Sequence, residues 1–123
     1  MRISLTFDDG PNMVTTPEVL EVLEQYKVKA SFFLVGQNIN AETKQMIQRQ
    51  VADGCTIENH SWTHSDMTKF SKEQIQDEVK RTSELITACA GAEPQFFRPP
   101  YISVNQLMYD SIPLPFICGM GVT

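Results

Sequence analysis

The sequence of 123 residues has little of several residue types, and each shortage argues against a class of protein. Lys and Arg number 10 against 15 Asp and Glu, and the resulting charge of −5 would repel a nucleic-acid backbone. No apolar run approaches the roughly 20 residues that a membrane-spanning helix needs. A charged-then-apolar leader is not found at the start, so we expect either a cytoplasmic protein or one whose leader has been removed.

Cysteine and histidine are also scarce. The three cysteines, Cys55, Cys89 and Cys118, are odd in number and lack C-x-x-C spacing, so they indicate neither a disulfide framework nor a zinc ribbon. We expect buried free thiols; one disulfide with one remaining thiol is the alternative. The only two histidines, His60 and His64, lie four residues apart.

What the chain does contain is an ordinary soluble composition, 41% apolar and 20% charged, in a length that fits one domain. Strand-like and helix-like segments alternate along it, punctuated by glycine, proline and capping residues. The expected strands cover residues 3–7, 31–35, 56–58, 95–97 and 114–118, and the expected helices cover residues 16–26, 41–52 and 72 to about 91. This alternation predicts an α/β fold with parallel strands and right-handed crossovers.

Polar motifs follow three of the expected strands. Asp8 and Asp9 end the first, His60 to His64 follow the third, and residues 98–101 (Arg-Pro-Pro-Tyr) follow the fourth. In parallel α/β architectures, barrels above all, functional residues collect at the carboxyl ends of the strands. We therefore expect the three segments to meet at one rim.

Two neutral imidazoles and one carboxylate can hold a divalent metal, and a second carboxylate is then left for proton transfer. Neighbouring strand residues point to opposite sides, so Asp8 and Asp9 should divide these roles unless the backbone turns there. Each motif also has a structural explanation: a solvated turn, histidines on a helix face, an arginine at a strand end, a tryptophan in the core. Two histidines and a carboxylate would also suit an iron oxygenase, although those sites usually lie in double-sheet folds.

Taken together, residues 6–11 (TFDDGP), 60–64 (HSWTH) and 98–101 (RPPY) resemble the first three motifs of the polysaccharide deacetylases, carbohydrate esterase family four. The resemblance runs from about residue 3 to the end. It implies a distorted, incomplete (β/α) barrel of TIM-like type. Residues 1–123 would then be the N-terminal part of one catalytic domain, truncated after about the fifth strand.

By this resemblance, Asp9, His60 and His64 ligate a divalent ion and leave positions open for water and substrate. Zinc is the expected ion, with cobalt, nickel or manganese as alternatives. Asp8 resembles the general base, which must stay ionised to accept a proton. Arg98 resembles the residue that orients Asp8 and holds it as an anion.

The main-chain N–H of Tyr101 would help to stabilise the oxyanion, and Trp62, Pro99 and Tyr101 are the expected substrate contacts. Ile102 departs from the glycine that many relatives carry after this tyrosine, which puts the shape of the substrate groove in doubt.

The implied reaction is removal of acetyl groups from an N-acetylglucosamine polymer, such as chitin or peptidoglycan, or from acetylated xylan. The family's C-terminal motifs, including a histidine that protonates the leaving group, are not found, and both histidines here are assigned to metal. We therefore expect a second polypeptide or a longer chain to supply the rest of the domain. The alternative is a non-catalytic carbohydrate-binding fragment. The family's substrates predict a secreted or wall-associated protein.

Overall fold

The computed structural model describes residues 5–11 and 15–117, with the side chain of Asp9 outside the described part. Within these residues three parallel strands form one sheet in the order β1-β2-β3. The strands are β1 (Leu5–Gly10), β2 (Ala30–Leu34) and β3 (Thr56–Asn59). The α-helices are α1 (Thr15–Tyr26), α2 (Lys44–Ala52), α3 (Lys72–Ala90) and α4 (Gln106–Ser111), and the 3-10 helices are η1 (Gly36–Asn38), η2 (Met67–Lys69) and η3 (Pro100–Ile102).

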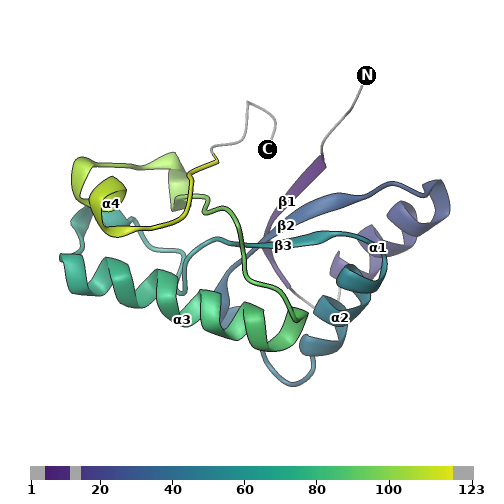
Figure 1. Cartoon of the computed structure of the whole chain (residues 1–123). Coiled ribbons are helices and arrows are strands. Elements are labelled where there is room, and N and C mark those ends of the chain that lie inside the picture. Colours follow the sequence, from purple (N-terminus) through teal and green to yellow (C-terminus); the bar gives the residue numbers. More distant parts are fainter. Residues whose placement is uncertain (1–4, 12–14, 118–123) are drawn as a thin grey trace.

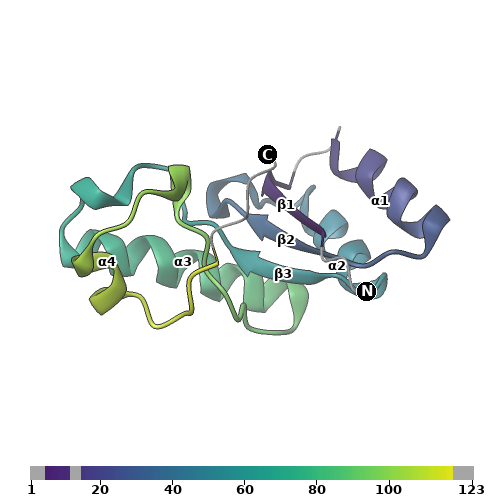
Figure 2. The same cartoon turned by 90° about the horizontal axis from the view of Figure 1, so that it is seen from above.

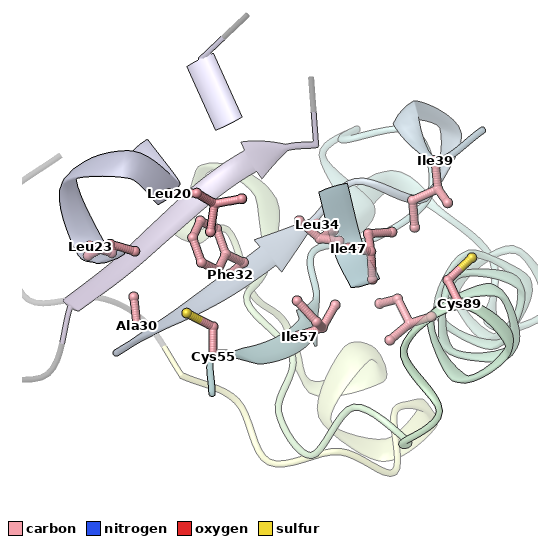
Figure 3. Close-up of a cluster of buried hydrophobic side chains, with 11 residues drawn as sticks. Leu20, Leu23, Ala30, Phe32, Leu34, Ile39, Ile47, Cys55, Ile57 and Cys89 are labelled. Carbon is pink, nitrogen blue, oxygen red and sulfur yellow. The ribbon is translucent and has the colours of Figure 1, made fainter. Parts of the chain in front are cut away.

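The helices divide the hydrophobic side chains into two clusters. Helices α1, α2 and α3 pack around the sheet, and their side chains join those of β2 and β3, as Figure 3 shows for Leu20, Phe32 and Ile47. A second cluster includes Phe97 and Met108 and lies where α3 meets α4. Helix α3 therefore links the sheet to the α4 end of the molecule (Figures 1 and 2).

The α/β class and the parallel pairing are confirmed, but the expected fourth and fifth strands are wrong. In the described part of the chain, Phe97 forms single parallel bridges with Asn59 and with Phe116. Prolines at 94, 99, 113 and 115 flank these bridges. Proline lacks the N–H that a ladder needs, so pairing cannot extend in either direction. The expected end of the fifth strand, Cys118, lies outside the described residues.

The ends of the helices follow their capping residues. Ser71 and Gln74 form the predicted capping box, and α3 ends at Gly91 with a left-handed φ of 76°. The second expected helix begins three residues late, because Asn40 Oδ1 accepts the N–H groups of residues 42 and 43 and so caps a preceding turn. Tyr26, the last residue of α1, is 68% exposed, and α4 was not predicted.

Two of the predicted free thiols are confirmed. Cys55 and Cys89 are buried and unbridged, and burial raises the pKa of the Cys55 thiol. Cys118 lies outside the described residues. Among the helices of residues 5–11 and 15–117, none is long and apolar enough to cross a membrane.

Gln50 is one of the buried polar side chains that have atoms without a hydrogen-bond partner among the described residues. Gln50 is fully buried on α2, and among the described residues neither its Oε1 nor its Nε2 has a hydrogen-bond partner. Gln50→Met should raise the free energy of unfolding by about 1–3 kcal/mol, because it removes a buried unsatisfied amide at similar volume. Urea denaturation measures this change. The matched control is Gln48→Met on the exposed face of the same helix, expected to stay within about 0.5 kcal/mol. Equal stability of the Gln50→Met variant and the wild type would contradict this account.

Candidate active site

The two histidines are delivered by the end of β3. The His60 N–H donates to the Leu34 carbonyl at 3.0 Å, so the chain continues beside β2 for one residue beyond the strand. Residues 60–64, called the histidine segment below, form a bend and not a helix. Ser61 and His64 adopt left-handed φ values of 70° and 61°, which turn the chain back on itself. The two imidazole centroids consequently lie 4.9 Å apart, with an interplanar angle of 72°.

His60 is buried, and its ring has a fixed orientation. Its Nδ1 lies 2.7 Å from the main-chain carbonyl oxygen of Arg98. A carbonyl only accepts, so Nδ1 carries the hydrogen and the Nε2 position carries the lone pair. A metal-ligating histidine needs this tautomer, and a carbonyl partner commonly sets it.

Arg98 connects the histidine segment to the carboxylates of β1. Its guanidinium forms an ion pair with Asp8 and also donates to Thr6 Oγ1 at 3.3 Å and to the Ile117 carbonyl at 3.2 Å. The guanidinium carbon lies 4.0 Å from the centroid of the Phe33 ring. Because Arg98 is 5% exposed and held on several sides, it can fix the position of the Asp8 carboxylate.

The backbone of β1 is irregular at the carboxylate pair. Asp8 lies opposite Phe33 and Gly10 opposite Leu34, so Asp9 is an extra residue in the ladder. Such a bulge re-aims side chains next to functional sites. The backbone thus departs from simple alternation between Asp8 and Asp9. The side chain of Asp9 lies outside the described part, and its role as a ligand stays a prediction.

Tyr101 forms the outer wall of the site. Its φ is 60°, its side chain is 68% exposed, and its ring centroid lies 4.9 Å from that of His64. Of the other two expected substrate contacts, Pro99 is buried, and Trp62 is half-buried with the Arg81 guanidinium 4.1 Å above its ring. Their roles toward substrate stay predictions.

Direct contacts therefore join all three motifs. Asp8 forms an ion pair with Arg98, and the main-chain carbonyl of Arg98 accepts from the His60 ring. The His64 ring in turn contacts the rings of both His60 and Tyr101. The expectation that the segments after the first, third and fourth predicted strands meet at one rim is confirmed.

The donor set fits a divalent metal. The two imidazoles, one with its tautomer fixed, are suitable donors, and with the predicted Asp9 carboxylate they would form the three-ligand set typical of a catalytic zinc site. His60 and His64 are the two expected ligands whose side chains the structure describes. Among the described side chains, no three His, Cys, Asp or Glu groups lie together as a complete metal site.

Glu78 was not predicted, although it contacts the histidine segment. Its carboxylate is 6% exposed and accepts the main-chain N–H groups of Trp62 and Thr63 at 2.8 Å and 3.0 Å. The signal in the sequence was a charged residue within the apolar stripe of the helix, next to Val79 and three residues after Ile75.

The family model described as polysaccharide deacetylase matches residues 1–112. The chain belongs to the polysaccharide deacetylase family. This membership, together with the parallel sheet, disfavours the iron oxygenase alternative.

Members of the family that are named for different activities are similar to this chain. A bifunctional xylanase/deacetylase from Pseudobutyrivibrio xylanivorans is 55% identical over 117 residues, which cover 95% of this chain and 19% of that protein. The peptidoglycan-N-acetylglucosamine deacetylase PgdA of Listeria monocytogenes is 36% identical over 116 residues, which cover 94% of this chain and 25% of that protein.

The fold matches a solved member as well. The structure of a family 4 acetyl xylan esterase from Clostridium thermocellum, in complex with a cobalt ion, is 42% identical with a TM-score of 0.93. The match covers 95% of this chain and 57% of that one. The chain thus spans little more than half of the solved structure and a quarter or less of the two curated relatives.

Proposed function

We propose that this protein is a metal-dependent enzyme that removes acetyl groups from a polysaccharide. The single observation that supports this best is the run of contacts from Asp8 through Arg98, His60 and His64 to Tyr101. These side chains come from three segments that are distant in the sequence, and each has a role in the proposed reaction. Membership of the deacetylase family agrees with the proposal.

In this proposal Asp9, His60 and His64 hold the metal. A bound divalent ion, zinc in the first instance, supplies Lewis acidity that polarises an acetyl carbonyl and lowers the pKa of water from about 15.7 toward about 7. The cobalt ion in the acetyl xylan esterase structure supports a divalent metal in this family.

The remaining residues move and stabilise charge. Asp8 accepts the proton of the attacking water, and its ion pair with Arg98 holds that carboxylate in position. The main-chain N–H of Tyr101 donates to the oxyanion of the tetrahedral intermediate. The intermediate then collapses: the bond from the acetyl carbon to the sugar oxygen or nitrogen breaks, that atom leaves with the proton that Asp8 took from water, and the acetyl group is released as acetate.

We propose acetylated xylan as the preferred substrate class, with N-acetylglucosamine polymers second. The xylanase/deacetylase is 55% identical, while the acetyl xylan esterase at 42% is level with a chitooligosaccharide deacetylase of Bradyrhizobium at 43% and above PgdA at 36%. We further propose that the protein acts outside the cell or at the wall, where such polymers lie. The remaining strands of the barrel would come from a longer chain or a second polypeptide.

Acetate release tests the proposal. The natural full-length protein is treated with a chelator and then given zinc, with acetylated xylan and N-acetylglucosamine oligomers as substrates. We expect no release from the metal-stripped protein, recovery with zinc, and faster release from xylan. Release that the chelator leaves unchanged would contradict metal dependence.

A non-catalytic carbohydrate-binding protein is the second candidate. The observation that favours it is the exposed ring of Tyr101, followed by Ile102 with 55% exposure, because exposed aromatic and apolar surface can bind a sugar without any reaction. Binding of xylan or chitin oligomers by the zinc-loaded protein without any acetate release would establish this candidate.

A further inference from the structure

Glu78 on α3 is a buried carboxylate whose partners all lie between the two histidines. Its Oε2 accepts the N–H groups of Trp62 and Thr63, and its Oε1 accepts the hydroxyl of Thr63. A buried carboxylate requires such donors, and these three come from one short segment 15 to 16 residues upstream.

A second side chain ties the beginning of the same segment to α3. Asn59 Oδ1 accepts the Ser61 N–H at 2.9 Å, while Asn59 Nδ2 donates to the Val79 carbonyl and to Ser83 Oγ, each at 2.9 Å. The histidine segment is therefore attached to one helix at both ends. Movement of α3 relative to this segment would change the positions of both imidazoles.

The backbone of the segment needs such an attachment. Ser61 and His64 occupy the left-handed region, which is unfavourable for residues other than glycine and persists only where the surroundings enforce it. Ser61 Oγ accepts the His64 N–H at 3.1 Å, so the two left-handed residues are linked to each other. Among the described hydrogen bonds, those to Glu78 fix residues 62 and 63 to α3, and the Arg81 guanidinium of the same helix also lies over the Trp62 ring.

We propose that Glu78 is a positioning residue for metal binding. Its hydrogen bonds among the described residues go to the segment between the imidazoles, and by fixing that segment it sets their separation of 4.9 Å. This inference rests on the proposed function, because it assigns His60 and His64 to the metal. Groups that orient ligands in this way typically contribute about 10- to 100-fold to metal affinity.

Two substitutions distinguish the hydrogen-bonding role of Glu78 from the effect of its negative charge. Glu78→Ala removes every acceptor, and we expect it to weaken Co²⁺ binding by about 10- to 100-fold. Glu78→Gln keeps an oxygen for the two N–H groups, and its Nε2 can donate to Thr63 Oγ1, which can then donate to Ser65 Oγ, 2.7 Å away. We expect the Gln variant to bind Co²⁺ as the wild type does. Titration calorimetry measures the affinity, and the visible absorption of bound Co²⁺ reports the ligand geometry.

The matched control is Glu84→Ala on the same helix, where the side chain is 68% exposed and its ion pair among the described residues is with Lys80. All measurements use the natural full-length protein. If Glu78→Ala does not fold, Glu78→Asp replaces it, since this retracts the carboxylate by one methylene and keeps its charge; we expect weaker binding and an altered Co²⁺ spectrum. The inference is overturned if the folded Glu78→Ala or Glu78→Asp variant matches the wild type in Co²⁺ affinity and spectrum. It is also overturned if Glu78→Gln weakens Co²⁺ binding as much as Glu78→Ala does. Unchanged Co²⁺ binding in His60→Ala would instead overturn the proposed function.

Discussion

Asp8→Asn should lower kcat/KM for acetate release by about 100- to 10,000-fold, the usual contribution of a positioned general base. An amide has a similar shape but cannot accept the proton of water. Its oxygen can still accept from Arg98, which also keeps Thr6 and Ile117 as acceptors. The geometry of the site should therefore survive while the chemistry is lost.

Release of acetate from acetylated xylan by the zinc-loaded, full-length protein measures this effect. The control is Asp77→Asn on α3, whose carboxylate is 63% exposed and pairs only with Arg81 among the described ion pairs. We expect the control to retain wild-type kcat/KM. If kcat/KM of the folded, zinc-loaded Asp8→Asn variant falls by less than tenfold, Asp8 is not the general base.

Gly36→Ala should lower the free energy of unfolding by about 1–3 kcal/mol. A Cβ at position 36 would lie 2.4 Å from Trp62 Cε3 and 2.5 Å from Thr82 Oγ1, closer than non-bonded atoms approach. The Trp62 ring would have to shift, together with the Arg81 guanidinium that lies 4.1 Å from its centroid. The Gly36 N–H also donates to the Ser61 carbonyl at 2.9 Å, so strain here is transmitted to the histidine segment.

Gly10→Ala is the matched control, since its Cβ would make only ordinary contacts of 3.6 Å with Leu34 and Thr16. Urea denaturation of both variants gives the comparison. We expect Gly10→Ala to remain near wild type. Equal stability of the two variants would mean that Trp62 does not pack against the backbone at residue 36.

Local signals in the sequence predicted the elements that local forces determine. The capping box at Ser71 and the left-handed Gly91 bound α3 as expected, because each satisfies backbone groups within a few residues. The expected fourth and fifth strands failed because their pairing depends on residues far away and is limited by nearby prolines.

The candidate site likewise has features that the sequence predicted and features that only the folded structure shows. Motif spacing and position after strands predicted that Asp8, His60 and Arg98 would meet, since parallel strands end at one rim. The sequence did not predict that left-handed residues, not a helix, bring the imidazoles together. Nor did it predict Glu78, because only the packing of α3 shows that this acid faces the histidine segment.

The proposed metal centre joins two segments, the end of β1 and residues 60–64, and zinc binding measures this directly. Calorimetric titration of the metal-stripped, full-length protein should find one tight zinc site per chain in this domain, and His60→Ala, His64→Ala and Asp9→Ala should each abolish it. Tight binding that survives loss of any one of these three side chains would contradict the account.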